Sequence, residues 1–301
     1  MSDIVNSNKR RSVALVVGFL VVAAVVGALV GLVAGEVLVV AVAFVAVAAV
    51  YLAVSFRMVE SIALRVGRAE PVDATDQPRL HNVVDGLCIT GGLPKPAVHV
   101  VDDPAPNAFV VGRSPNHAAI AMTSGLLETL ERVELEGVVA QQLSQVKNHD
   151  TLVASLAVTV IAPISLLADV LIRKKWWNGG RVERAGDQGE RSNPLAYIGF
   201  GLLAFSPLTG WLMRTVIPPS RETLADMSAC QVTRYPPGLI AALEKMNKDV
   251  TVTHSATTAT AHLWIEQPLS GVGDAGKLGS VHKLFDTHPP LEERIALLRE
   301  L

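Results

Sequence analysis

The fold of this chain is decided at residues 13–56, which read VALVVGFLVVAAVVGALVGLVAGEVLVVAVAFVAVAAVYLAVSF. The only polar side chains in this stretch are those of Glu36, Ser55 and Tyr51. The pair Gly35-Glu36 divides it into apolar pieces of 22 and 20 residues. At a rise of roughly 1.5 Å per residue, each piece forms a helix about as long as the hydrocarbon core of a bilayer is thick. The sequence therefore predicts a transmembrane helical hairpin that is retained rather than cleaved as a signal peptide.

Basic residues orient this hairpin. They precede it at Lys9, Arg10 and Arg11 and follow it at Arg57, Arg65 and Arg68. The connecting turn carries no lysine or arginine. Because cytoplasmic flanks are the ones enriched in basic residues, both ends of the hairpin should lie in the cytoplasm. We therefore expect a multi-pass protein of the cell membrane whose globular part is on the cytoplasmic side.

Three glycines, Gly27, Gly31 and Gly35, line one face of the first apolar piece. Such a face lets another backbone approach closely, which would suit association with a separate membrane protein. A tight hairpin needs small residues at the same places, and we favour this second interpretation.

The composition excludes some classes of protein. With 28 acidic and 26 basic residues the net charge is −2, so we expect no nucleic-acid partner. A mean hydropathy of +0.38 places part of the chain in the lipid bilayer. Cys88 and Cys230 lack the spacing of a zinc knuckle or of a disulfide framework, so we expect them to be buried and reduced.

A second pair of apolar stretches runs over residues 151–172 and 195–217. The loop between them contains Arg173, Lys174, Lys175, Arg181, Arg184 and Arg191. This basic loop opposes a hairpin that crosses the membrane, whereas the length of the stretches favours one. We expect a spanning hairpin that returns the chain to the cytosol, with a re-entrant or interfacial hairpin as the alternative.

The region between the two hairpins has the patterning of a small globular unit. Helices are expected at residues 76–87, 124–130 and 133–149, and strands at 98–101, 108–111 and 118–121. The predicted protein is thus mainly helical and of the α+β class, with a small three-stranded sheet. Its expected segments are 1–57 (first hairpin), 58–150 (first part of the globular domain), 151–217 (second hairpin) and 218–301 (second part).

Several ordered motifs resemble the HtpX family of membrane-bound zinc metallopeptidases. They are Leu93-Pro94-Lys95-Pro96, Asp102 to Phe109, Gly112-Arg113, Thr123 to Glu128, Glu134 to Asp150, Ser220 to Asp226 and Thr287 to Ile295. The two hydrophobic hairpins also stand in family positions, so the resemblance covers nearly the whole chain. It implies a metallopeptidase-like domain of gluzincin type, into which the second hairpin is inserted, and a role in membrane-protein quality control.

The centre of the family motif is altered in this chain. The family's active helix carries H-E-x-x-H, in which two histidines bind zinc and the glutamate activates the metal-bound water. This chain has Gln141-Gln142-Leu143-Ser144-Gln145 instead. Of the positions that the resemblance assigns to the metal, which are 141, 145 and 222, only Glu222 keeps a residue type that binds zinc well. Gln142 takes the place of the catalytic base.

Glutamine cannot perform the replaced chemistry. Its amide oxygen is a weak neutral ligand, and an amide does not accept a proton near neutral pH. We therefore expect neither a bound cofactor nor catalysis at Gln142. We further expect amide hydrogen bonds from these glutamines to Glu222 to replace the metal.

A rearranged metal site is the alternative. Its best ligands would be His149, one turn beyond Gln145, together with Glu222 and His288. In that case the cofactor would be zinc. We favour the simpler interpretation, in which His149 ends a helix and His288 shapes the turn before Pro289.

The cleft could still bind a peptide. By the resemblance, Asn107, Ala108 and Phe109 form part of a wall that holds an extended substrate, and these residues are intact. An edge strand offers unpaired backbone groups to an extended peptide whether or not a metal is present. An equally weighted interpretation is that these residues only maintain the sheet.

The leading hypothesis is a catalytically inactive HtpX-like pseudopeptidase that binds membrane-protein segments or a partner protein. The first alternative is an active zinc metalloendopeptidase with a rearranged site, and the second is a structural subunit of a membrane assembly.

Overall fold

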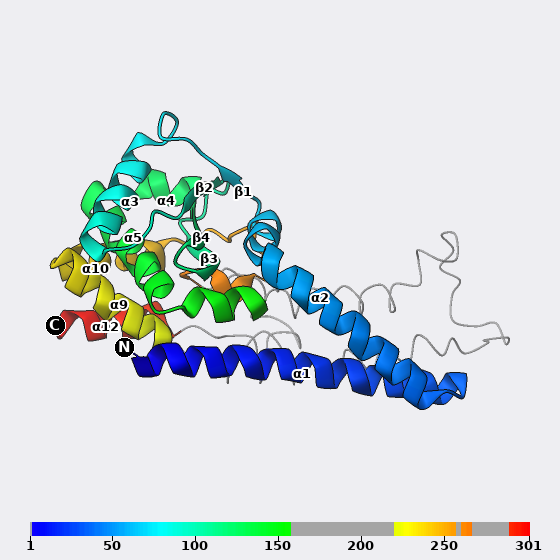
Figure 1. Ribbon diagram of the computed structural model, residues 1–301. Coiled ribbons are helices and arrows are strands. Elements are labelled where there is room, and N and C mark those ends of the chain that lie inside the picture. The colour runs from blue at the N-terminus through cyan, green and yellow to red at the C-terminus, as the bar shows by residue number, and fades with distance from the viewer. Residues whose placement is uncertain (1, 158–219, 257–259, 267–288) are drawn as a thin grey trace, which may run out of the picture.

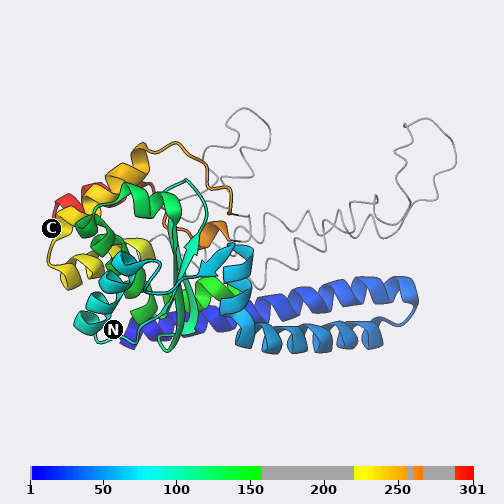
Figure 2. The ribbon, with the colours of Figure 1, turned by 90° about the horizontal axis from the view of Figure 1, so that it is seen from above.

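The computed structural model describes residues 2–157, 220–256, 260–266 and 289–301 of the chain (Figure 1). Two long helices project from a mixed unit of helices and strands, and they lie side by side in both Figure 1 and Figure 2. The predicted second hairpin falls largely on residues 158–219, and its loop entirely so. That prediction therefore lies outside the described residues.

The two long helices are the predicted hairpin. Helix α1 is Ser2–Ala34 and helix α2 is Val37–Val66. Gly35 lies between them with a φ of +79°, a left-handed conformation that glycine adopts at little cost. The stretch 12–34 of α1 and all of α2 are long and apolar enough to cross a membrane. The predicted helical hairpin is therefore present as two long apolar helices, and its passage through the membrane stays a prediction.

The glycines of α1 serve the contact with α2. A Cβ atom on Gly27 would lie 2.8 Å from the Cα of Ala41, and one on Gly31 would lie 2.6 Å from the Cα of Val37. No real Cβ atom fits at such distances, so glycine is required for the two helices to pack. This supports the favoured interpretation of the glycine face.

Helix α2 continues past the apolar stretch and joins the hairpin to the sheet. Val59, Ala63 and Leu64 are buried, and Ala63 and Leu64 pack with residues of strands β3 (Ala108–Ser114) and β4 (His117–Thr123). The hairpin helix is therefore longer than the predicted segment 1–57.

The sheet has four strands, so the prediction of three was wrong. The fourth is β1, Ala69–Pro71, which pairs antiparallel with β2, Ala97–Val101. The strand order is β1-β2-β4-β3, with β2 and β4 parallel and β3 antiparallel to β4. Sequence patterns missed β1 because it has only three residues and ends in proline, which a sheet accepts at its edge.

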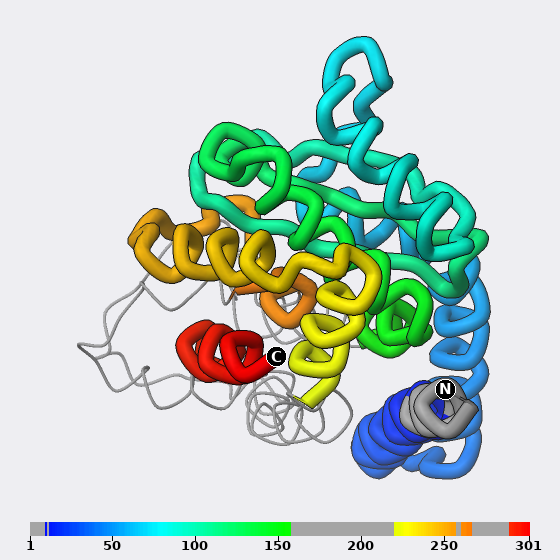
Figure 3. The backbone as a smooth tube through the Cα atoms, turned by 90° about the vertical axis from the view of Figure 1, so that its left-hand side faces the viewer, coloured from blue at the N-terminus to red at the C-terminus, as the bar shows by residue number. Residues whose placement is uncertain are grey.

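Within the described residues, six helices lie on one side of this sheet. They are α3 (Pro78–Gly91), α4 (Ser124–Thr129), α5 (Arg132–Lys147), α9 (Ser220–Thr233), α10 (Pro236–Lys248) and α12 (Leu291–Arg299). Helix α5 contacts β3, α4 contacts β4, and the others pack around α5 or on one another. A short 3-10 helix, η2, is formed by Ala261–Leu263. Figure 3 shows α9, α10 and α12 gathered beside α5, with which α9 and α10 are in contact.

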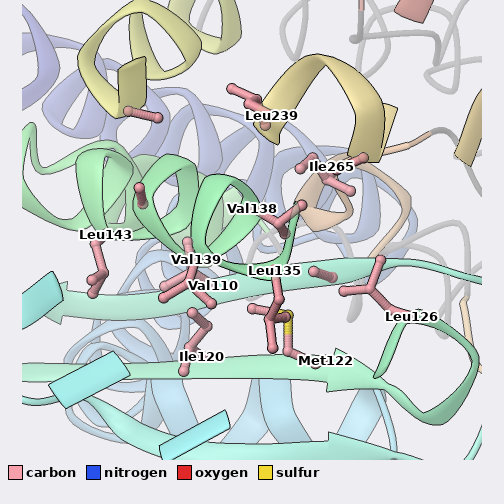
Figure 4. Close-up of a cluster of buried hydrophobic side chains, with 14 of the residues drawn as sticks. Val110, Ile120, Met122, Leu126, Leu135, Val138, Val139, Leu143, Leu239 and Ile265 are labelled. Atoms are coloured by element: carbon pink, nitrogen blue, oxygen red, sulfur yellow. The ribbon is translucent and has the colours of Figure 1, made fainter. Parts of the chain in front are cut away.

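Helix α5 lies at the centre of the main core (Figure 4). Leu135, Val139 and Leu143 lie toward the sheet, where they meet the side chains of Val110, Ile120 and Met122, and Val138 points toward Leu239 and Ile265. Segments on both sides of the undescribed region 158–219 therefore share one core, with α5 between them.

Candidate active site

Helix α5 places two of the three glutamines in the interior. Gln141 and Gln142 are fully buried, whereas Gln145 is partly exposed. The Gln142 Nε2 donates a hydrogen bond of 2.7 Å to the Gln141 Oε1. Within the described residues, the Gln141 Nε2 and the Gln142 Oε1 have no hydrogen-bond partner. The two amides thus bind each other and leave one donor and one acceptor unsatisfied in the core.

A charged group lies beside these amides. Glu222 and Asp226 are one turn apart on α9, and Arg294 comes from α12. The Arg294 Nε and Nη2 each donate to a different oxygen of Asp226 at 2.7 Å. The Arg294 Nη1 donates to the Glu222 Oε2 at 2.8 Å and to the Ile265 carbonyl oxygen at 2.9 Å. One buried guanidinium therefore connects two carboxylates and the backbone of a third segment.

The hydrogen bonds expected from Gln141 and Gln142 to Glu222 are not formed. Gln142 donates to Gln141 instead, and Gln141 Nε2 finds no partner among the described residues. Arg294 donates to Glu222 instead. The physical reason is that a charge-assisted bond from a guanidinium is about twice as strong as one from a neutral amide.

The pKa directions follow from burial and charge. Burial alone would lower the pKa of Arg294, but the charges of Asp226 and Glu222 raise it above its ordinary value. Burial raises the pKa of Asp226, and the charge and hydrogen bonds of Arg294 oppose this rise. The Gln141 amide also acts to lower the pKa of Asp226, although its Nε2 completes no hydrogen bond among the described residues. Arg294 is thus held in its charged form.

Comparison with known proteins identifies the family. Residues 74–301 match the model of peptidase family M48. A protein named Protease HtpX homolog from Tropheryma whipplei (strain TW08/27) is 39% identical over 84% of this chain and 83% of its own length. This chain belongs to peptidase family M48 and is of the HtpX type. A homologue of the same name from Limosilactobacillus reuteri (strain DSM 20016) is 34% identical over 98% of this chain and 97% of its own.

Similarity to solved structures is weaker. The crystal structure of S. mikatae Ste24p is 20% identical, with a TM-score of 0.42 over 76% of this chain and 51% of that one. The assignment to M48 therefore rests on the sequence comparisons, and it confirms the predicted family.

The alternative metal ligands of this M48 protein are only partly described. Helix α5 ends at Lys147, and His149 follows the C-cap with a left-handed φ of 58°. The helix predicted to reach residue 149 therefore ends two residues earlier, and His149 lies in a turn before a further helical segment begins at Asp150. His288 lies outside the described residues, and those described contain no group of three or more metal-binding side chains.

The predicted peptide-binding wall of this M48 protein is at the edge of the sheet. Asn107, Ala108 and Phe109 are all buried, and β3 is the last strand in the sheet order. Trp264 forms an antiparallel bridge with Phe109. The two rings pack edge to face, with their centroids 4.7 Å apart. Peptide binding at this wall stays a prediction.

Sequence reasoning missed three important residues, Arg294, Asp226 and Trp264. Arg294 and Asp226 lie inside motifs shared with the HtpX family. Nothing in the sequence indicated that these two residues form an ion pair. Trp264 lies outside any motif that we considered. Cys88 and Cys230 are buried as predicted, and burial raises the pKa of each thiol to about 11, so both are protonated at neutral pH.

Proposed function

We propose that this M48 protein is a pseudopeptidase that lacks zinc-dependent catalysis and binds extended segments of membrane proteins or of a partner protein. The observation that carries the proposal is the residue set at the centre of the site. Two buried glutamines bind each other where the family motif has its first histidine and its glutamate, and Glu222 is bound by Arg294.

The donor set does not fit zinc. A catalytic zinc ion takes three protein ligands and keeps a fourth position open. Of the three positions assigned to ligands, 141 and 145 carry amides, which are weak neutral donors. A single carboxylate at Glu222 cannot hold the ion.

The charge already present argues in the same direction. The Arg294 guanidinium is fully buried and lies 2.8 Å from the Glu222 carboxylate. A divalent cation at that carboxylate would lie next to a fixed positive charge in a medium of low dielectric constant, where like charges repel strongly. Arg294 thus neutralises Glu222 in this structure, and it does so from a motif that the chain shares with the zinc-binding family.

The position of the family's catalytic base is also altered. Gln142 occupies the position of the family's glutamate, and an amide does not take up a proton from water near neutral pH. Loss of the base and loss of the ligands are independent defects, so correcting one alone should not restore catalysis.

The hairpin supplies the cellular setting of the proposal. Its basic flanks favour a cytoplasmic position for the globular part, next to the membrane. An edge strand in that position suits the capture of unfolded segments of membrane proteins on the cytoplasmic side.

A second candidate is an active zinc metalloendopeptidase with a rearranged site. It is favoured by 34–39% identity to relatives that are named as proteases. This candidate requires His149 and His288 as ligands with Glu222, so replacing either histidine by alanine should abolish activity.

The two candidates are distinguished by hydrolysis of a denatured membrane-protein substrate by the full chain in detergent with added zinc. We expect no cleavage by the natural protein. We expect cleavage by the triple variant Gln141→His, Gln142→Glu, Gln145→His, and none by the three single variants. The control is Gln231→His, which adds a histidine at an exposed position of α9. Cleavage by the natural chain that stops in the His149→Ala variant would establish the second candidate instead.

A further inference from the structure

A second segment of the chain pairs with the outer edge of β3. Residues 264–266, which we call the resident strand, lie along Asn107–Phe109, and Trp264 forms an antiparallel bridge with Phe109. The Ile265 N–H donates to the Ala108 carbonyl oxygen at 2.8 Å. This backbone bond is of the kind by which an extended peptide adds to a sheet edge.

Side chains fix the resident strand on both sides of this bond. The Asn107 amide binds both backbone groups of Glu266, accepting from its N–H at 3.2 Å and donating to its carbonyl oxygen at 3.0 Å. The Trp264 ring packs against Phe109. Trp264 and Ile265 are nearly completely buried, at 1% and 2% exposed. Each of the three residues of the predicted peptide-binding wall is thus engaged by the resident strand.

The resident strand is also connected to the candidate active site. The Arg294 Nη1 donates both to the Ile265 carbonyl oxygen and to Glu222. The same nitrogen therefore holds the strand and the carboxylate, so a change at one of them alters the bonding available to the other.

The attachment of the resident strand is short and leaves one buried donor unsatisfied among the described residues. Strand β4 pairs with β3 at six register positions, whereas the resident strand forms a single isolated bridge. The Trp264 Nε1 is buried without a partner among the described residues. A buried donor without a partner costs about 1–3 kcal/mol, so an incoming strand that avoids this cost could compete.

We propose that residues 264–266 occupy the peptide-binding edge of β3 in cis, so that an extended peptide binds there only when this strand is displaced. The inference rests on the proposed function, because it assumes that a peptide binds at β3. Residues 264–266 would compete with that peptide for the same edge. The ligand class is an extended polypeptide with neighbouring apolar side chains, since the resident strand buries Ile265 in one hydrophobic cluster and Trp264 in another.

The test uses a variant that weakens the resident strand. Ile265→Pro removes the N–H that bonds to Ala108 and keeps the carbonyl oxygen that accepts from Arg294. The matched control is Val250→Pro, because Val250 is 92% exposed and lies outside the strand. The probe is a fluorescent, end-blocked peptide with the sequence of residues 260–266, compared with a scrambled peptide, and binding to the full chain in detergent is followed by anisotropy.

We expect Ile265→Pro to bind the probe about tenfold or more tightly than the natural protein and Val250→Pro do, with no gain for the scrambled peptide. Equal, measurable affinity of all three proteins would overturn the inference and leave the proposed function standing. No binding by any of them, with hydrogen exchange showing residues 107–109 freed in Ile265→Pro, would overturn the proposed function and the inference together.

The natural protein supplies a measurement that does not depend on folding of the variant. At a saturating concentration of the probe, the inference predicts faster hydrogen exchange in residues 264–266 and continued protection in residues 107–109. Unchanged protection of residues 264–266 while the probe is bound would contradict the displacement.

Discussion

Arg294 determines the electrostatics of the site at the scale of single residues. Its side chain is completely buried and bonded to Asp226 and Glu222. Removing one partner of a buried ion pair leaves the remaining charges uncompensated, which is far more damaging than the pair itself is stabilising. Arg294, Asp226 and Glu222, which come from two helices, together set the charge at this site.

The first prediction concerns this ion pair. Arg294→Ala should lower the free energy of unfolding by about 3–5 kcal/mol, because it leaves two acidic side chains without their cation. Arg299→Ala is the control on the same helix, since Arg299 binds Glu244 with 64% of its own side chain exposed and should cost less than about 1 kcal/mol. Denaturant unfolding of both variants in detergent measures the difference, and equal losses would contradict the role given to Arg294.

The second prediction concerns Glu266. Burial, and then the charge of Asp249, raises the pKa of Glu266 from 4.5 to about 7, while Arg294 acts to lower it. The folded state therefore holds a proton that the unfolded state releases between these pH values, so this group makes the protein less stable as the pH rises from about 4.5 to 7. Glu266→Gln replaces the titrating carboxyl group with an amide, so the variant should not lose this stability as the pH rises.

The melting temperature of Glu266→Gln, relative to the natural protein, should accordingly be higher at pH 8 than at pH 5. Scans of both proteins at the two pH values measure this difference. A relative melting temperature that is the same at both, or lower at pH 8, would show that Glu266 ionises normally in the folded protein.

At the scale of elements, helix α5 must approach α10 closely for both halves of the globular unit to share one core. A Cβ atom on Gly137 would lie 2.7 Å from the backbone nitrogen of Leu239. Backbone at this distance cannot move aside as a flexible side chain does. The contact therefore requires glycine.

The third prediction follows from this contact. Gly137→Ala should destabilise the protein by about 1–3 kcal/mol, because the added methyl group forces α5 and α10 apart. Gly86→Ala, in α3, has open space around the added atom and should be neutral or stabilising by up to about 1 kcal/mol. Unfolding of the two alanine variants under the same conditions makes the comparison, and a neutral Gly137→Ala would contradict the close packing.

Some of these elements could be predicted from the sequence and others could not. The hairpin was predictable because residues 13–56 carry a local signal, and the positions of β2, β3 and β4 were predictable from short apolar runs between turns. Strand β1 and the resident strand were not, because each is three residues long and gains its hydrogen bonds from residues far away in the sequence. Arg294 was hidden for a similar reason, since a basic residue in Leu291–Arg299 reads as part of an exposed helix face until Asp226 is placed beside it.

At the scale of the whole molecule, the fourth prediction concerns topology. We expect the hairpin 151–217 to enter the membrane and return the chain to the cytosol, because residues 220–256 and 289–301 pack with the segment that follows the first hairpin. A cysteine at Ser192 should be labelled by an impermeant reagent from outside, and the buried thiols of Cys88 and Cys230 give a low background. Labelling from the cytosolic side alone would indicate a re-entrant or interfacial hairpin instead.

The absence of a zinc site is the central claim about the molecule, and zinc content after exposure tests it most directly. The full chain in detergent is incubated with zinc, dialysed against a mild chelator and analysed for metal per chain, with Glu222→Ala and Gln231→His treated in parallel. We predict no stoichiometric zinc in the natural protein, because the glutamines offer only weak donors and Glu222 is bound to Arg294. One equivalent retained by the natural protein and by Gln231→His, and lost from Glu222→Ala, would contradict the account.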